Sequence, residues 1–542
     1  MNNKDIIKTL ADSKIAKYSS KIINRGLSLA ISIEQENSSN YFNNLLEKAI
    51  ELYENREYKE SLDILDKIAH SSPVRDKTDF WETKAKSLSK LTRYPAAIES
   101  FYKILEIEEE IDYLYDLLLE EAGELCYEEQ HREALIFHEA AIKVKPHDSW
   151  GYYSQGMTQF ILGLYEEAVE SFNKSIAIEV DDPKIWEWLA DALHQLERYE
   201  EELLAYEQLI QIDPNESYLW TGKANALYKL YRYTDALNAY DKAIEIGSNY
   251  AWVWLERGAI LDELQLYEEA NLSYDKASIV DLIYTLNWLF NKANESCNLN
   301  NFQKAVRLFD KVTEIQSEYF EAWYNKGYCL FHLQKYERAI VAFDKAITIQ
   351  TQDYQDRAWY LKGVALYNIQ KYQDAVECFR QTVAIKLDHF MGFYFWGASL
   401  NELCQYNQAI INFDRAISIE PKLAVAWNDR GVALLNQQKY EETIYSCDKA
   451  IEIESNLYMS WLNKGTAFLS LQNYFEAIES YDRAIKIKPD YWEAWYNKGI
   501  AMQNLQRYYE AAFCCQKALE INPDYLPAKQ NLELLNLKLT NY

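Results

Sequence analysis

A small residue, glycine or alanine, recurs fourteen times along the chain at intervals of 34 to 37 residues. These residues are Ala49, Ala85, Ala122, Gly156, Ala190, Ala224, Gly258, Ala293, Gly327, Gly363, Gly397, Gly431, Gly465 and Gly499. A period of this length is typical of repeat arrays, in which each unit is one supersecondary element. A single hydrophobic core stops growing at about 250–300 residues. A chain of 542 residues built on this period is therefore predicted to form an array of stacked units.

Apolar residues recur at further positions of the same repeat. With the small residue numbered as position 8, position 4 is Trp in nine units, position 17 is Tyr in twelve, position 20 is Ala in eleven, and position 24 is Phe or Tyr in ten. Positions 4, 8 and 11 lie on one face of a first helix, and positions 17, 20, 24 and 27 lie on one face of a second. Proline at position 32 in six units ends that second helix. Each unit is therefore predicted to be an antiparallel helix pair that buries its apolar faces against its neighbours.

The pattern resembles the tetratricopeptide repeat, which has Trp, Gly or Ala, Tyr, Ala, an aromatic residue, Ala and Pro at matching places over 34 residues. The resemblance covers residues 42–525. It implies an all-α fold, a right-handed superhelical solenoid of antiparallel helix pairs, in which positions 2, 5, 6, 9, 12 and 13 of the first helices line a concave groove. The chain departs from the family at position 7, which is Lys or Arg in ten units, and in weaker units near the N-terminus and around residues 290–309.

The array is expected to have distinct ends and two distinct halves. Residues 1–41 are predicted to be an N-terminal helical cap, or alternatively a docking segment for a partner or a membrane surface. Residues 42–300 form an acidic half and residues 301–525 a nearly neutral half. Residues 526–542 are predicted to form a capping helix, because a terminal repeat needs a polar outer face.

Catalytic sequence patterns are missing from the chain. It contains no GxGxxG, P-loop, HExxH or GxSxG motif. His131 and His138 stand at positions 17 and 24, which are usually aromatic, and this indicates packing rather than metal binding. Because the repeats occupy nearly all of the chain, we expect a protein that is not an enzyme and that has no cofactor and no metal. A catalytic site built across repeats is the alternative.

Composition narrows the cellular setting and the class of ligand. The eight cysteines form no CxxC pair and are expected to be reduced thiols in the core. No stretch approaches the roughly 18 consecutive apolar residues of a membrane span, and the N-terminus lacks the apolar block of a secretory signal. We therefore predict a cytoplasmic protein without a membrane span. The net charge of -28 argues against direct binding of nucleic acid, since phosphate backbones repel an acidic protein.

Acidic residues are concentrated in the first part of the chain. Residues 1–300 hold 30 basic and 55 acidic side chains, whereas residues 301–542 hold 26 and 29. The segment 106–129 alone has eleven acids and no Lys or Arg. A solvated outer face would account for this excess. Such a field would also attract a basic ligand in a salt-dependent way, so it predicts a partner with a basic segment.

The positions that line the groove in the resembled family identify candidate binding residues here. The acidic candidates are Glu120, Glu187, Asp191, Glu256, Asp262 and Glu263. The aromatic candidates are Trp188, Tyr218, Tyr228, Trp252, Tyr324, Phe331, Tyr360, Tyr367, Tyr394 and Phe395. Aromatic side chains of this density are suited to anchoring a peptide or helix, although packing between neighbouring first helices would also account for many of them.

Position 6 adds a third group of candidates. It holds Asn291, Asn325, Asn463 and Asn497. The row resembles part of the asparagine ladder by which the superhelical arm of the N-acetylglucosamine transferase holds peptide backbone, since an amide offers both a donor and an acceptor. The match is partial, because Leu361, Phe395 and Asp429 interrupt it.

These observations predict a non-catalytic scaffold or adaptor that captures a protein or peptide in a long groove, and that can belong to a large complex. Two alternatives remain open. The protein could be a regulatory or sensor subunit of a separately encoded protease, nuclease or transferase. It could also be an assembly chaperone, which would change the yield of its partner rather than the partner's activity.

Overall fold

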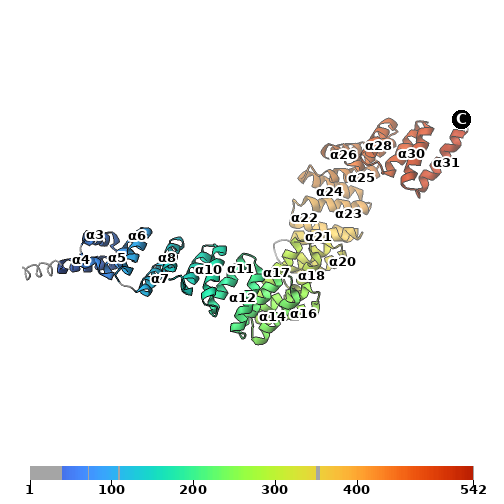
Figure 1. Ribbon diagram of the computed structural model, residues 1–542. Helices are drawn as coiled ribbons and strands as arrows, with labels where there is room; N and C mark the ends of the chain where they lie inside the picture. The colour runs from blue at the N-terminus through green and yellow to red at the C-terminus, as the bar shows by residue number, and fades with distance from the viewer. Residues whose placement is uncertain (1–38, 71, 108–109, 350–354, 541–542) are drawn as a thin grey trace, which may run out of the picture. The chain divides into compact units, whose positions relative to one another are not determined.

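The computed structural model describes residues 39–70, 72–107, 110–349 and 355–540, in which helices follow one another in pairs (Figure 1). In these residues the regular secondary structure is α-helical throughout, which confirms the predicted all-α solenoid of antiparallel helix pairs. Most of the predicted N-terminal segment 1–41 lies outside the described residues. The first described helix covers residues 39–54.

The chain divides into two compact units, residues 1–276 and 277–542, and the division falls inside α16 rather than near residue 300, where the charge balance changes. Unit 1 contains α3 (Tyr58–Ile68), α4 (Ser72–Arg75), α5 (Thr78–Lys90), α6 (Tyr94–Leu105), α7 (Ile111–Tyr127), α8 (His131–Val144), α9 (Ser149–Ile161), α10 (Tyr165–Ile178), α11 (Pro183–Gln195), α12 (Tyr199–Ile212), α13 (Ser217–Lys229), α14 (Tyr233–Ile246), α15 (Ala251–Glu263) and most of α16 (Tyr267–Val280).

Unit 2 has the same alternation of first and second helices. It contains α17 (Leu282–Asn298), α18 (Phe302–Ile315), α19 (Phe320–His332), α20 (Tyr336–Thr348), α21 (Gln355–Asn368), α22 (Tyr372–Ile385), α23 (Phe390–Glu402), α24 (Tyr406–Ile419), α25 (Ala424–Asn436), α26 (Tyr440–Ile453), α27 (Tyr458–Ser470), α28 (Tyr474–Ile487), α29 (Trp492–Asn504), α30 (Tyr508–Ile521) and α31 (Leu526–Thr540). The last helix, α31, packs on α30 and buries Leu535, while Leu534 and Leu537 are exposed.

The turn between the two helices of a pair has the same geometry in all fourteen repeats. The residue at position 15 has a φ of 56° to 66° in thirteen repeats, where it is not glycine, and 75° in the fourteenth, where it is Gly163. After it, the N–H at position 16 donates to the carbonyl at position 11, as from Asn473 to Phe468 at 2.9 Å. This is the Schellman arrangement that satisfies the last carbonyls of a helix. The array therefore makes its tight turns with little glycine.

The first prediction concerns this left-handed position. Gln334 is exposed and has a φ of 56°, a conformation that costs an L-residue about 1–2 kcal/mol but costs glycine almost nothing. Gln334→Gly is expected to raise the free energy of unfolding by about 0.5–1 kcal/mol, because the greater entropy of unfolded glycine offsets part of the gain. Gln334→Val should lower it, because a β-branched residue tolerates positive φ worst. Urea denaturation followed by circular dichroism measures both, and an equal effect of the two substitutions would contradict the argument.

Helix pairs close through a contact between position 8 and the side chain at position 24. In six repeats a Cβ added to the glycine at position 8 would lie 2.4–2.8 Å from the aromatic ring at position 24. The pairs are Gly156–Phe172, Gly258–Tyr274, Gly327–Phe343, Gly363–Phe379, Gly397–Phe413 and Gly465–Tyr481. Where position 24 is cysteine, as at Cys447 opposite Gly431, the added Cβ would lie at 3.2 Å. The ring at position 24 therefore occupies the space that the glycine at position 8 leaves free.

A second prediction separates this packing from helix propensity. Gly327→Ala is expected to destabilise the protein by about 1–2 kcal/mol, because overpacking against the fully buried Phe343 exceeds the roughly 1 kcal/mol that alanine gains as a helix former. Gly123 lies in α7, is exposed, and has nothing within 4 Å of an added Cβ. The matched substitution Gly123→Ala should therefore stabilise by about 1 kcal/mol. Unfolding midpoints of the two variants should move in opposite directions; shifts of the same sign would refute the packing argument.

Candidate functional site

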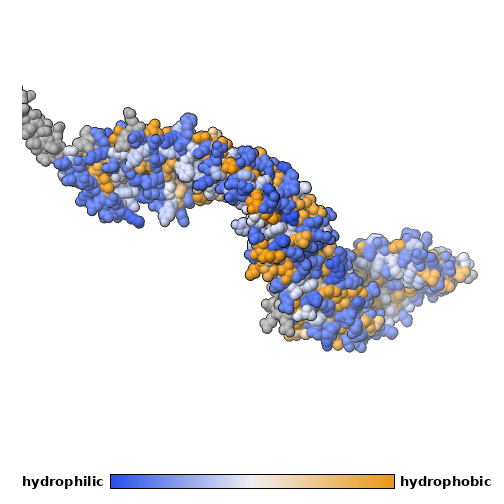
Figure 2. All heavy atoms as spheres, turned by 90° about the horizontal axis from the view of Figure 1, so that it is seen from below, coloured by the Kyte–Doolittle hydropathy of each residue, from blue (hydrophilic) through white to orange (hydrophobic). Residues whose placement is uncertain are grey.

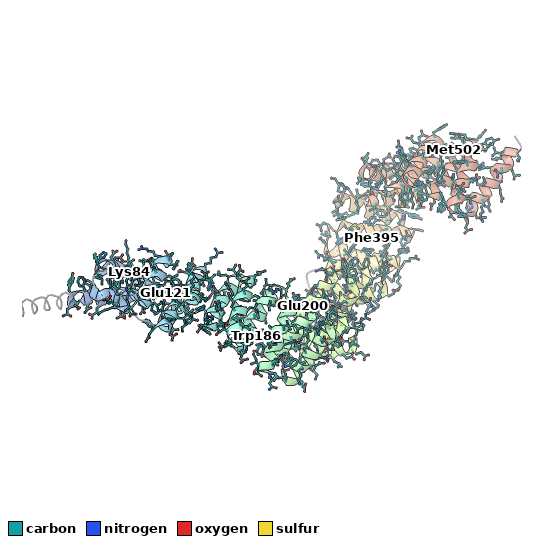
Figure 3. All side chains as sticks on the ribbon, in the orientation of Figure 1. Lys84, Glu121, Trp186, Glu200, Phe395 and Met502 are labelled. Carbon is teal, nitrogen blue, oxygen red and sulfur yellow. The ribbon has the colours of Figure 1, made fainter. Side chains whose placement is uncertain are left out.

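The cation at position 7 links each repeat to the preceding one. In eight repeats its side-chain nitrogen lies 2.5–3.0 Å from a carboxylate at position 25 of the preceding repeat. The pairs are Lys84–Asp66, Lys223–Glu207, Arg257–Asp241, Lys326–Asp310, Lys362–Asp344, Arg430–Asp414, Lys464–Asp448 and Lys498–Asp482. In seven of these repeats the cation also lies 4.2–5.9 Å from the ring centroid of the Trp at position 4. Lys84, the first of them, is labelled in Figure 3. These cations are therefore engaged within the fold.

The tryptophan at position 4 holds the loop between repeats. In seven repeats its Nε1–H donates to the backbone carbonyl six residues earlier, at 2.7–3.3 Å. In α11, for example, Trp186 donates to Val180 (Figure 3). Positions 4, 7, 8 and 24 thus serve the packing of the array. Positions 5 and 6 of the first helices point elsewhere, since they lie about 100° and 200° further round the helix than position 4.

Two of the predicted acidic residues take part in contacts between neighbouring first helices of unit 1. Glu120 on α7 is exposed, and its carboxylate lies 3.4 Å from Nζ of Lys86 on α5. Glu187 on α11 is half-buried and accepts a hydrogen bond from the hydroxyl group of Tyr218 on α13. Both carboxylates therefore lie between successive first helices.

The other acidic candidates differ in burial. Asp191 and Glu263 are exposed, and Glu256 is half-buried. Partial desolvation raises the pKa of Asp191, and the charge of Glu187 adds to this rise. Asp262 is only 7% exposed, and it accepts a hydrogen bond of 3.0 Å from the Tyr274 hydroxyl. The structure therefore places Asp262 in the interior of the α15–α16 pair, where it satisfies the tyrosine at position 24.

The remaining aromatic candidates of unit 1 are half-buried. The ring of Trp188 meets Phe160 edge-on, with 5.2 Å between centroids, and Tyr228 is tilted against Tyr233 at 5.7 Å. Trp252 packs against the buried cluster of α13–α15. These rings support the stacking of neighbouring repeats while keeping part of their surface exposed.

In unit 2 the aromatic candidates form a connected group centred on Phe395, on α23 (Figure 3). Its ring stacks on Phe379 with 5.8 Å between centroids. It also lies 6.0 Å from Tyr360, 5.8 Å from Tyr367 and 5.0 Å from Tyr394. All three tyrosines are half-buried, and burial raises the pKa of both Tyr360 and Tyr367 to about 12. The structure therefore brings four predicted residues of α21 and α23 into one group.

Two further aromatic candidates lie on α19. Tyr324 stacks on Phe320 with 6.1 Å between centroids, and Phe331 meets Tyr336 edge-on at 5.4 Å. Phe331 and Phe395 both pack against the same buried cluster, which includes Phe379. The aromatic group therefore extends from α23 back to α19.

The asparagines at position 6 are accessible to different degrees. Asn291 is exposed, whereas Asn325, Asn463 and Asn497 are half-buried. The side-chain amide of Asn325 donates to Oδ1 of Asn294 on α17 at 2.8 Å. The row thus consists of amides that hydrogen-bond to neighbouring first helices in some repeats.

A polar network on α25, which the sequence analysis did not include, connects the aromatic group to the asparagine row. The Oδ1 of Asn428 accepts hydrogen bonds from Ser460 at 2.8 Å and from Asn463 at 3.2 Å. The Nδ2 of Asn428 donates to Asp429, which also accepts a hydrogen bond of 2.9 Å from the Tyr394 hydroxyl. Asn428 and Asp429 stand at positions 5 and 6. Their positions are therefore ones that line the groove in the resembled family.

The carboxyl group of Asp429 is electrostatically unusual. Desolvation raises its pKa, and the nearby charge of Glu402 raises it further. The hydrogen bonds from Asn428 and Tyr394 lower its pKa and so oppose the rise. Desolvation is the largest of these effects, so the carboxyl group holds its proton more tightly in the fold than in water.

The histidines, cysteines and carboxylates of the described residues bear on whether the chain has a metal or nucleophilic site. In that part of the chain no group of three or more His, Cys, Asp or Glu could hold a metal ion, and no helix is long and apolar enough to cross a membrane. His138 is buried, its Nε2 lies 3.1 Å from Oγ1 of Thr158, and burial lowers its pKa to about 4. Five of the eight free cysteines are buried, and desolvation raises the pKa of Cys514 and Cys515 to about 11.

A third prediction tests the state of Asp429. Because its pKa is raised in the folded protein, the fold binds the proton more tightly than the unfolded chain, and stability is lost as the pH rises through the folded pKa. Asp429→Asn should therefore be at least as stable as wild type at pH 7.5. The wild type should gain stability relative to this variant as the pH falls toward the ordinary Asp value of about 3.9. Urea unfolding between pH 4.5 and 7.5 measures the difference, with the exposed Asp524→Asn as control. The same pH dependence in all three proteins would exclude a raised pKa at Asp429.

Comparison with known proteins agrees with the repeat geometry. Residues 153–217, 320–352, 356–389 and 492–525 match models described as the tetratricopeptide repeat, and residues 465–506 match a model described as a TPR repeat. A 92-residue stretch is 30% identical to the BBSome complex member bbs-4 of Caenorhabditis elegans. This stretch covers 17% of the chain and 19% of that relative, so the chain matches about a fifth of the relative's length.

Solved structures with similar folds share little sequence with the chain. YrrB, a TPR protein described as having an unusual peptide-binding site, is 24% identical with a TM-score of 0.32, over 35% of this chain and 97% of that one. Yeast Tom70 is 15% identical with a TM-score of 0.32, over 80% and 97%. The Cut9–Hcn1 complex is 15% identical with a TM-score of 0.36, over 90% and 95%. The fourteen-fold pattern, the helix pairs and the family matches together identify the chain as a tetratricopeptide repeat protein.

Proposed function

We propose that the protein is a non-catalytic scaffold that binds a protein or peptide along the groove face of its first helices, which is formed by positions 5 and 6 together with positions 2, 9, 12 and 13. The observation that carries this proposal is that different positions of the repeat serve packing and remain partly exposed. Positions 4, 7, 8 and 24 are engaged in packing. In several repeats positions 5 and 6 hold partly exposed aromatic, amide or carboxylate groups, as in the pairs Glu187–Trp188, Tyr324–Asn325 and Tyr394–Phe395, whereas other repeats bury a residue there, such as Leu255. A face of this kind has anchors for side chains and partners for backbone groups.

The chemistry of unit 2 favours a segment that offers both apolar side chains and backbone amides. The aromatic group around Phe395 supplies apolar contact area, and rigid aromatic side chains are frequent anchors in interfaces. Next to it, the half-buried side chains of Asp429 and Asn463 supply an acceptor and an amide. An extended peptide exposes alternating donors and acceptors along its backbone, so it would match such a surface.

The chemistry of unit 1 favours a basic partner. Most of the net charge lies in the first 300 residues, and Glu187, Asp191 and Glu263 place carboxylates on the first helices. Long-range attraction would speed association with a basic segment and would weaken as salt is added. Asp262 is left out of this set because its carboxylate is used inside the helix pair.

A fourth prediction tests whether the carboxylates on the first helices, rather than the net charge of the protein, attract the partner. The triple variant Glu187→Lys, Asp191→Lys and Glu263→Lys should reduce the capture of partner proteins from a lysate of the source organism at least tenfold, and should flatten the salt dependence of capture. Quantitative mass spectrometry of the captured proteins, at several salt concentrations, measures both effects.

The control variant has the same change in charge on the second helices. Glu167, Glu200 and Glu268 are exposed on α10, α12 and α16, and Glu200 is labelled in Figure 3. Reversing these three charges should leave most of the capture intact. Equal losses in the two variants would mean that only net charge matters, and unchanged capture in both would contradict the proposed role of unit 1.

A further inference from the structure

The α19–α20 pair carries a small cleft that none of the residues at positions 5 and 6 line. Trp323 and Leu330 of α19 and Val341 and Ala342 of α20 line it, together with the charged residues Lys326, Glu337 and Arg338. Its volume is about 270 Å³, slightly below the roughly 300–1,000 Å³ of pockets for drug-sized ligands. In Figure 2 the apolar surface of the molecule occurs in patches within a largely hydrophilic surface. The size of this cleft suits a single side chain.

Sister repeats show what fills this place. In the α25–α26 pair, Tyr445 at position 22 meets Trp427 edge-on, with 6.0 Å between centroids and 77° between planes. In the α29–α30 pair, Phe513 at the same position meets Trp495 at 6.2 Å and 77°. The chain thus places an aromatic ring against the position 4 tryptophan twice, with nearly identical geometry.

A lysine at position 26 accompanies each of these rings. Nζ of Lys449 lies 5.9 Å from the ring centroid of Tyr445, and Nζ of Lys517 lies 5.7 Å from that of Phe513. A cation within about 6 Å of an aromatic face is attracted by the ring quadrupole. In both repeats the ring at position 22 therefore lies between the indole at position 4 and the lysine at position 26.

The α19–α20 pair has a tryptophan at position 4 and a lysine at position 26, as these two pairs do, but it has no aromatic residue at position 22. Position 22 is Val341, which is 59% exposed, and position 26 is Lys345, which is also exposed. Trp323 is held in place, since its Nε1 donates to Ser317 at 2.8 Å and Lys326 lies 4.2 Å from its ring. A related cleft of about 320 Å³ beside Trp186 (Figure 3) has Gln208 at position 26 and so lacks the cation.

We propose that the α19–α20 cleft binds an aromatic side chain of a partner protein, with the ring edge-on to Trp323 and covered by Lys345. The incoming ring takes the place that Tyr445 and Phe513 occupy in their own repeats. Because Trp323 is already fixed by its hydrogen bond and by Lys326, little ordering is required on binding. This site uses none of the residues at positions 5 and 6, so it is proposed in addition to the groove.

The site can be tested with N-acetyl-tyrosinamide as the probe and N-acetyl-leucinamide as its aliphatic counterpart. In the full chain with labelled Leu and Val methyl groups, the aromatic probe should shift the NMR signals of Val341 and Leu330, with a dissociation constant on the order of millimolar, as expected for one side chain. The leucine probe should shift these signals at least twofold less at the same concentration. Absent shifts, or equal shifts with the two probes, would overturn the proposal.

Two substitutions make the test specific. Val341→Phe should fill the cleft as Phe513 does in its repeat, and should abolish the shift at Leu330. Lys345→Met keeps the length of the side chain and removes its charge, so it should weaken the aromatic probe about two- to fivefold and leave the leucine probe unchanged. Binding by Val341→Phe at wild-type strength, or equal effects of Lys345→Met on both probes, would place the ring elsewhere and refute the assignment.

Discussion

The contact between position 8 and position 24 is the constraint on which the rest of the array depends. A glycine such as Gly327 leaves room for the ring of Phe343, so the two helices of a pair approach closely and the ring becomes fully buried. A missing side chain in one helix and a large one in the next make a packing unit that can be repeated many times. In the six repeats with glycine opposite a ring, a methyl group added at position 8 would overlap the ring, whereas the four repeats with alanine opposite a Phe or Tyr ring, such as Ala85 and Phe101, accommodate one.

Once the pairs are closed, a second set of contacts joins them into a stack. The indole of a tryptophan such as Trp323 hydrogen-bonds to the preceding loop, and the cation at position 7 joins its ring to a carboxylate of the preceding repeat. An exposed ion pair alone contributes little to stability. Here the lysine stem also covers an aromatic surface, and the same arrangement recurs in seven repeats, so many small contributions set the relation of one repeat to the next.

This use of side chains leaves two surfaces on which repeats differ in chemistry. Positions 5 and 6 vary from carboxylates in unit 1 to the aromatic group and the Asn428–Asp429 network in unit 2. Position 22 ranges from Phe513, which covers its own tryptophan, to Val341, which leaves Trp323 accessible in a cleft. Repeat arrays acquire binding sites in this way, because residues outside the packing positions can change without disturbing the stack.

Periodicity alone was sufficient to predict the helix pairs and the packing role of the tryptophans. A helix returns the same face every 3.6 residues, so local spacing decides which side chains share that face. Individual roles within the candidate site depended on contacts between helices. Asp262 stands at a position that lines the groove in the resembled family. In the structure it is buried and accepts a hydrogen bond from the hydroxyl of Tyr274. Asp429 was passed over as an interruption of the asparagine row, although Tyr394 and Asn428 make it the centre of a network. Burial and hydrogen bonding depend on residues twelve to thirty-five positions away, and that information is created only when the repeats pack against each other.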